Sequence, residues 1–159
     1  MPRAMNKIYH IGFAVLRLEE AMEEYGKIFG TTFCAPVSRN YHMVEQRSED
    51  GRVYNGPFNG RFTYSVEGPV HIELIEVSGD GIWSPSGERF HHFGMWSVDP
   101  LLQAQELESV GFRWEARLHS DDGSVPIVFV RKKDIRVELL NESRRPNFLD
   151  WVEGRRGGP

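Results

Sequence analysis

The feature that most constrains this chain is that its two halves repeat one pattern. Residues 9–16 read Y-H-I-G-F-A-V-L, and residues 91–98 read H-H-F-G-M-W-S-V. In both segments a histidine is followed two residues later by a glycine and then by mostly apolar residues, which is the pattern of a strand. This self-similarity indicates a fold assembled from two related units.

Each of these strands is followed by a stretch with helical periodicity. In the first half, apolar residues recur at steps of three and four, which places on one helix face Leu18, Ala21, Met22, Tyr25 and Phe29. Gly30 is a good terminating residue for this helix. In the second half the apolar steps run from Leu101 to Val110, Pro100 suits the first turn, and Gly111 ends the helix.

Three strand-like segments follow each helix. They are residues 41–47, 61–66 and 70–77 in the first half, and residues 112–118, 125–131 and 135–140 in the second. The Gly- and Asn-containing stretch from Asp50 to Gly60 reads as turn or loop. Each half therefore reads β-α-β-β-β, and the Gly-, Ser- and Pro-rich segment Ser78–Arg89 is the expected linker.

These elements predict an α+β protein with one domain, residues 1–153, made of two half-repeats at about 7–77 and 90–141. A flexible tail is expected over residues 154–159. The segment before it, Pro146–Glu153, carries Phe148 and Trp151. We expect this segment to pack over an edge or a partner subunit, or else to help line a pocket.

The last strand of each half carries a glutamate, in V-H-I-E-L-I (70–75) and I-R-V-E-L-L (135–140). Side chains alternate faces along a strand, so Glu73 and Glu138 point away from the apolar residues beside them. A buried carboxylate is costly unless it is paired or coordinated. Together with the repeated histidines, His10 and His92, the pattern predicts one divalent metal ion held by these four side chains. Two imidazoles and two carboxylates suit Zn, Ni, Co, Mn or Fe and do not distinguish among them.

No catalytic role is assigned to His91 or to the aromatic residues near the predicted ligands. His91 adjoins His92 and should point to the opposite face of a regular strand. Four aromatic residues are expected in the core rather than on a substrate-binding wall: Phe62, Tyr64, Trp96 and Phe129.

Composition and charge argue against several classes of binding partner and cellular setting. The formal net charge is -4, with no basic field that would attract nucleic acid or an anionic membrane. No apolar run approaches the ~20 residues of a membrane helix. A single cysteine, Cys34, excludes an internal disulfide and suits a reducing, cytoplasmic setting.

The four motifs in this order resemble the vicinal oxygen chelate superfamily, which includes glyoxalases, bleomycin-resistance proteins and extradiol dioxygenases. The resemblance extends from Ile8 to about Asn141. It implies two βαβββ modules whose sheets curl into a cup around the metal. It also implies that His10 and His92 match the first-strand ligands, and Glu73 and Glu138 the last-strand ligands. No other cofactor is implied, and dimerisation is an analogy only.

With a carboxylate at Glu73, the ligand set is most similar to the glyoxalase I and methylmalonyl-CoA epimerase branch. That resemblance implies a lyase or isomerase acting on a small substrate. Glu138 or Glu73 would remove a proton next to a metal-bound carbonyl and form an enolate. Two alternatives stay open: an Fe(II)-dependent ring-cleaving dioxygenase, and a non-catalytic protein that binds an antibiotic-type small molecule.

Overall fold

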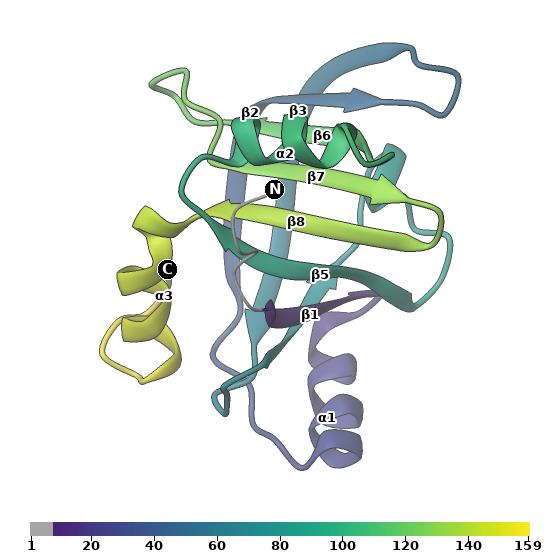
Figure 1. Ribbon diagram of the computed structural model, residues 1–159. Helices are drawn as coiled ribbons and strands as arrows, with labels where there is room; N and C mark the ends of the chain where they lie inside the picture. The colour runs from purple at the N-terminus through teal and green to yellow at the C-terminus, as the bar shows by residue number, and fades with distance from the viewer. Residues whose placement is uncertain (1–7) are drawn as a thin grey trace.

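The structure, a computed structural model, describes residues 8–159 and is built mainly from strands (Figure 1). Its elements, in chain order, are β1 (Ile8–Val15), α1 (Leu18–Phe29), β2 (Val37–Arg47), β3 (Val53–Tyr64), β4 (His71–Glu76), the 3-10 turn η1 (Gly81–Trp83), β5 (Arg89–Ser97), α2 (Pro100–Glu108), β6 (Arg113–His119), β7 (Ile127–Lys132), β8 (Ile135–Asn141), the 3-10 turn η2 (Glu142–Arg144) and α3 (Arg145–Val152).

The eight strands form one closed barrel in the order β1-β4-β3-β2-β6-β7-β8-β5. In each half the first and last strands pair in parallel, β1 with β4 and β5 with β8, while the remaining pairs are antiparallel. The halves meet at two antiparallel seams, β1 with β5 and β2 with β6. The expected α+β architecture with two βαβββ modules and a curved mixed sheet is therefore confirmed, and the second seam closes the curve.

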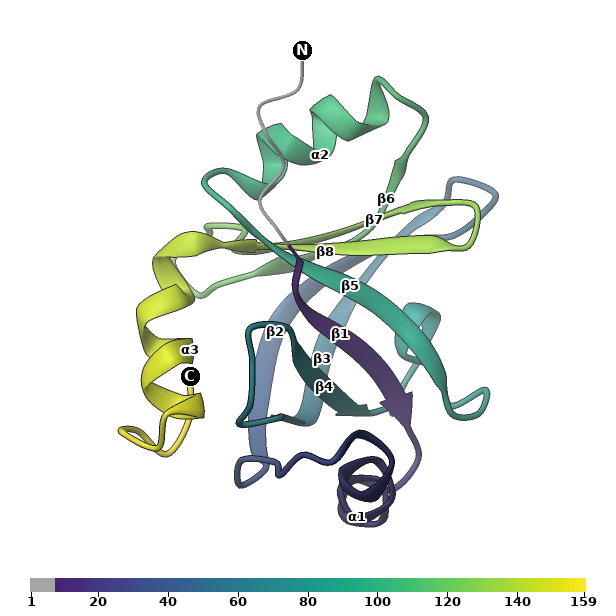
Figure 2. The same ribbon diagram turned by 60° about the horizontal axis from the view of Figure 1, so that its bottom comes forward.

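Helices α1 and α2 lie outside the barrel, one on each module (Figures 1 and 2). The apolar face of α1 packs on β1 and β4 through Leu18, Ala21 and Leu74. On the second module Leu107 packs with Leu139 and Val128. Gly30 closes α1 as expected, in the left-handed region at φ 64°, where glycine is favoured. The second helix, α2, begins at the expected Pro100 but ends at Glu108, before Gly111. Asp99 caps α2 by accepting a hydrogen bond from the Leu102 amide.

The prediction of a loop from Asp50 to Gly60 is wrong over most of this range, because β3 begins at Val53. Only the turn ahead of Val53 is irregular, and β3 then pairs with β2 along its length. The register of β2 shifts between Tyr41 and Val44, opposite Pro57. Proline lacks an amide proton and is tolerated in a sheet at such bulges. Pairing with β2 thus overrides the turn-forming composition of this segment.

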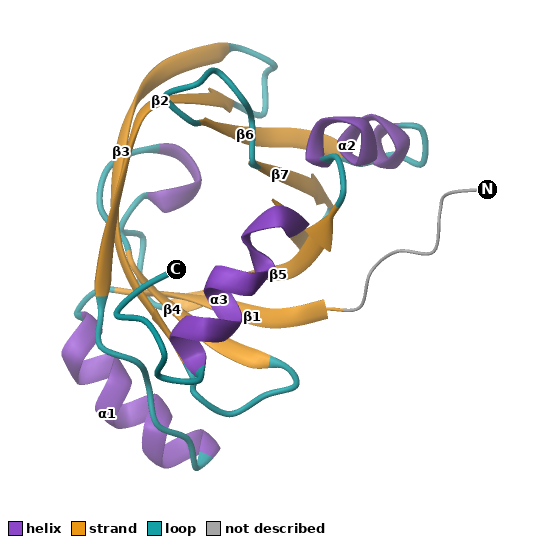
Figure 3. Cartoon of the chain, turned by 90° about the vertical axis from the view of Figure 1, so that its left-hand side faces the viewer, coloured by secondary structure: helices purple, strands orange, loops and turns teal. Residues whose placement is uncertain are grey.

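The segment after β8 forms helix α3, which lies across one open end of the barrel (Figure 3). Phe148 and Trp151 are buried, and they pack edge-on against Tyr64 with ring centroids 5.0 Å and 5.6 Å away. Of the roles expected for this segment, the structure shows the lining of a pocket, to which Asn147 and Phe148 contribute. Among residues 8–159, no helix is long and apolar enough to span a membrane.

Candidate metal centre

Two glycines in the β1–β5 seam create the space in which the site is built. In this antiparallel pair His10 lies opposite Gly94, and Gly12 lies opposite His92. A Cβ atom on either glycine would collide with the imidazole of the opposite histidine. The repeated H-x-G motif is therefore reciprocal, because the glycine of each module makes room for the histidine of the other.

The parallel strand pairs, β1 with β4 and β5 with β8, place the two glutamates beside the same two glycines. Glu73 on β4 is the partner of Gly12, and Glu138 on β8 is the partner of Gly94. Each glycine is thus flanked by a histidine from the other module and a glutamate from its own. All four side chains point into the barrel, where they are buried.

The four side chains converge on one point. The Nε2 atoms of His10 and His92 lie 2.7 Å apart. The Oε2 atom of Glu73 lies 3.3 Å from Nε2 of His10 and 3.1 Å from Nε2 of His92. The corresponding distances from Oε2 of Glu138 are 3.3 Å and 3.5 Å. One potential ligand atom from each residue lies within 4.8 Å of all the others.

The state of these atoms fits a divalent cation. The Oε2 atoms of Glu73 and Glu138 are buried and accept no hydrogen bond. Such atoms are costly to leave without a partner. Two imidazole nitrogens and two carboxylate oxygens form a donor set typical of Zn, Mn, Fe, Co or Ni. The sequence-predicted site residues are therefore brought together, and their binding of a metal stays a prediction.

The four side chains also shift one another's pKa values, because their charges lie close together. Burial disfavours a charged imidazole, but the facing carboxylates of Glu138 and Glu73 outweigh it and raise the pKa of His92 to about 9. The pKa of His10 is raised for the same reasons. Burial works against the carboxylates as well, yet the two histidines lower the pKa of both Glu73 and Glu138. Without a cation, the cluster holds protons where a metal would bind.

His91, which a regular strand would turn away, lies against His92. The register shifts so that Gly12 faces His92 while Phe13 faces Phe90, which makes His91 the extra residue of a β-bulge. Its Nδ1 lies 2.9 Å from Nδ1 of His92, and its Nε2 lies 2.8 Å from the carbonyl oxygen of Ile82. The expectation that His91 faces the opposite side is therefore wrong, because strand alternation fails at a bulge.

The hydrogen bond between His91 and His92 determines which ring nitrogen of neutral His92 carries the proton. A carbonyl only accepts, so Nε2 of His91 donates to Ile82. Burial lowers the pKa of His91 well below its usual value, so the ring is neutral and its Nδ1 accepts. Once its extra proton is lost, His92 therefore keeps the remaining proton on Nδ1, which donates to His91, and has its lone pair on Nε2, the atom that faces the carboxylates. Arg136, paired with the buried Glu115, donates to the carbonyl of His91 and supports the bulge.

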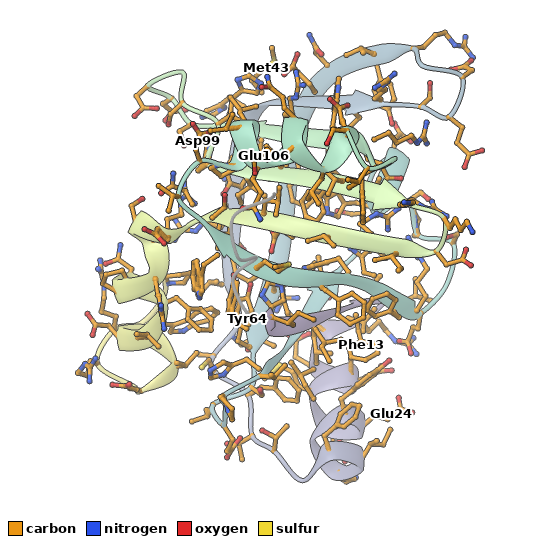
Figure 4. All side chains as sticks on the ribbon, in the orientation of Figure 1. Phe13, Glu24, Met43, Tyr64, Asp99 and Glu106 are labelled. Carbon is orange, nitrogen blue, oxygen red and sulfur yellow. The ribbon has the colours of Figure 1, made fainter. Side chains whose placement is uncertain are left out.

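A cavity of about 450 Å³ leads from this cluster, and Glu73 and Glu138 form part of its lining. Its walls are largely aromatic and include Phe62, Tyr64, Trp96 and Phe129. The ring of Tyr64, labelled in Figure 4, lies 5.2 Å from that of His10. Phe148 and Asn147 of α3 also line the cavity.

The expectation that these four aromatic residues serve only the core is therefore incomplete. They are partly or wholly buried, as core residues are, but one side of each ring borders the cavity. Sequence reasoning also missed Arg144, another lining residue. Alternation along a strand distinguishes the inside of a barrel from the outside, but it does not reveal which inward side chains leave a space between them.

Comparison with known proteins agrees with this architecture. The sequence profile of the glyoxalase/bleomycin resistance protein/dioxygenase superfamily matches residues 9–113, and the chain belongs to this superfamily. No protein with a curated description matches the sequence significantly.

Several solved structures share the fold. A single-residue variant of the methylmalonyl-CoA epimerase of Streptomyces coelicolor, in complex with 2-nitronate-propionyl-CoA, is 20% identical with a TM-score of 0.55, over 87% of this chain and 95% of that one. The methylmalonyl-CoA epimerase of Mycobacterium tuberculosis is 18% identical with a TM-score of 0.52, over 86% and 88%. A hypothetical protein from Bacillus halodurans is 17% identical with a TM-score of 0.54, over 86% and 94%.

Proposed function

We propose that this protein is a metal-dependent lyase or isomerase. In this proposal one divalent ion is held by His10, Glu73, His92 and Glu138, and a proton is removed next to a carbonyl of a small substrate. The observation that carries the proposal is the convergence of four buried ligand atoms, two of them carboxylate oxygens without a hydrogen bond, at the inner end of a cavity.

The fold comparison supports the epimerase-like form of this reaction, because several structures of similar fold are methylmalonyl-CoA epimerases. When bound, a divalent ion would act as a Lewis acid that makes the C–H bond beside a substrate carbonyl more acidic. The protein's own contribution is a set of oriented, buried carboxylates beside a cavity with many aromatic side chains, an environment in which electrostatic effects are strong.

Glu73 and Glu138 are the proposed bases, because both carboxylates border the cavity. One of them takes the proton from carbon and holds it on a carboxylate oxygen, while the electron pair of the broken C–H bond moves toward the carbonyl. Returning the proton to the opposite face completes an epimerisation, and returning it to the next carbon completes an isomerisation.

Solvent deuterium exchange tests this proposal. Metal-loaded protein in D₂O is incubated with 2-oxo-thiohemiacetals, 2-substituted acyl-CoAs and hydroxyketones, and deuterium at the carbon next to the carbonyl is followed by NMR. We expect exchange that disappears on chelation. It should fall about 10²–10⁴-fold in Glu73→Gln or Glu138→Gln, whichever removes the base.

Glu76→Gln is the matched control, since Glu76 lies on the same strand as Glu73 but pairs with Arg61, accepts the Leu18 amide, and does not line the cavity. It should exchange like the wild type. Absence of exchange on every substrate, together with metal-dependent oxygen uptake, would replace this proposal with the dioxygenase alternative.

A further inference from the structure

The cavity is lined by charged groups of both signs. Its acidic side chains are Glu73 and Glu138 of the ligand cluster. The remaining charged lining residues are three arginines, Arg39, Arg144 and Arg156. Most of the uncharged lining is aromatic or aliphatic.

Arg144 is the arginine best placed to meet a ligand. It is half-buried in η2, immediately before α3. Its guanidinium donates to the hydroxyl of Tyr41 at 3.1 Å and to the hydroxyl of Ser120 at 3.4 Å. Both partners are neutral, and within residues 8–159 Arg144 forms no ion pair with a carboxylate. Its charge acts on the carboxylate of Asp122 only from beyond ion-pair distance. The guanidinium is thus held in position without a directly bound counter-ion.

Two further arginines line the same cavity. Arg39 on β2 donates to the main-chain oxygen of Pro159, and Arg156 donates to the neutral side-chain oxygen of Asn147 at 2.5 Å. A guanidinium has five N–H donors in a planar fork that matches carboxylate and phosphate oxygens.

The aromatic part of the lining favours a ligand with an apolar body. Trp83 stacks on Phe58 with centroids 4.2 Å apart and meets Phe129 edge-on at 5.6 Å. Phe129 in turn lies against His92, with centroids 5.3 Å apart. These rings are packed against one another and are therefore fixed walls. A volume of about 450 Å³ is the size of pocket that encloses a compact small molecule.

We propose that the substrate is a compact aromatic or branched apolar molecule with oxygen donors at one end and an anionic group, a carboxylate or a phosphate, at the other, which Arg144 binds. This assignment of substrate class rests on the proposed function for the oxygen-bearing end only. The anion subsite is formed by arginines that are not part of the ligand cluster.

Matched probes test the assignment by calorimetric titration of metal-loaded protein. Benzohydroxamate offers two chelating oxygens and a ring, and its 4-carboxy and 4-phosphono derivatives add an anion at the far end. We expect the better of the two anionic probes to bind at least ten times more tightly than benzohydroxamate. The preference between them identifies the anion.

The Arg144→Gln variant should lose this advantage and leave binding of benzohydroxamate unchanged, while Arg144→Lys should retain part of it. The matched control is Arg145→Gln, because Arg145 is the exposed next residue and does not line the cavity. Arg39→Gln provides a second test in case Arg144→Gln does not fold. Equal binding of charged and neutral probes, or equal loss in the Arg145 control, would overturn the assignment.

A second titration separates this result from the metal proposal. Metal-free protein, kept with chelator, is titrated with 4-tert-butylbenzoate, which has an apolar body and a carboxylate but no chelating end. Binding that depends on Arg144 here supports the anion subsite even if no metal-dependent exchange is ever found. Exchange activity without any Arg144-dependent anion preference leaves the metal proposal standing and refutes the subsite.

Discussion

At the residue scale, Gly12 and Gly94 have the sharpest consequences for the candidate metal centre. Neither has a positive φ angle, so alanine would cause no backbone strain there. It would instead push its Cβ atom into the imidazole of His92 or His10. We expect Gly12→Ala and Gly94→Ala to cost about 1–3 kcal/mol through overpacking. Both should abolish stoichiometric metal binding, measured by elemental analysis.

The control is Gly56→Ala, because Gly56 lies within β3 and has open space where a Cβ atom would be added. Its metal content should equal that of the wild type. Full metal occupancy in Gly12→Ala and Gly94→Ala would show that the histidines do not need this space to bind.

His91 is expected to act through His92. A phenylalanine at this position keeps a buried ring but removes the acceptor for Nδ1 of His92, so the imidazole is no longer held in one tautomer. Loss of such a supporting partner typically weakens metal affinity about 10–100-fold. Competition with a chelating indicator measures this change.

His71→Phe is the matched control for that experiment. His71 is buried and bonds to the carbonyl of Ser65, without contacting a ligand nitrogen. A loss of affinity as large in His71→Phe as in His91→Phe would mean that general packing, rather than the bond to His92, explains the effect.

At the scale of elements, α3 joins the wall of the cavity to the core. Trp151 is buried and contacts Phe62 and Tyr64, whereas Leu149 on the same helix is exposed. We expect Trp151→Ala to cost about 3–5 kcal/mol of unfolding free energy. Leu149→Ala should change it by about 0.5 kcal/mol or less. Urea titration measures both, and similar midpoints for the two variants would show that α3 is only loosely attached.

A comparison of the predicted and observed strands and helices also shows which features of the fold the sequence does not predict. The order of strands and helices, and the face on which Glu73 and Glu138 lie, follow from local periodicity and from the repeat. The bulge at His91 and the register shift opposite Pro57 depend on the pairing of strands with other strands. Local composition does not reveal that register, so the sequence predicts only the end of β3, within residues 61–66, and does not predict the contact between His91 and His92.

At the scale of the whole molecule, the candidate ligands tie the two modules together, since each module supplies one histidine and one glutamate. The repeat made this juxtaposition predictable, because equivalent positions in two related modules meet about their shared seam. The cavity and its arginines were not predictable in the same way. They depend on closure of the barrel and on η2 and α3, which have no counterpart in the repeat.

The same arrangement predicts how pH acts on stability. In metal-free protein the pKa of His92 is raised from 6.5 to about 9, so its protonation stabilises the fold fully below pH 6.5 and this contribution disappears as pH rises through 9. The lowered pKa values of Glu73 and Glu138 contribute above their unfolded value of 4.5 and are lost on acidification. Metal-free protein should therefore become less stable between pH 6.5 and 9.

Metal-loaded protein should behave in the opposite way, because a cation must displace protons from the histidines and this becomes easier as pH rises. A ligand present at 100 times its Kd adds about 2.7 kcal/mol to the unfolding free energy. We expect the difference in Tm between zinc-loaded and chelator-treated protein to widen steadily from pH 6.5 to 9. The difference should vanish in His92→Ala. A gap that stays constant or narrows over this range would mean that protons and metal do not compete for these side chains.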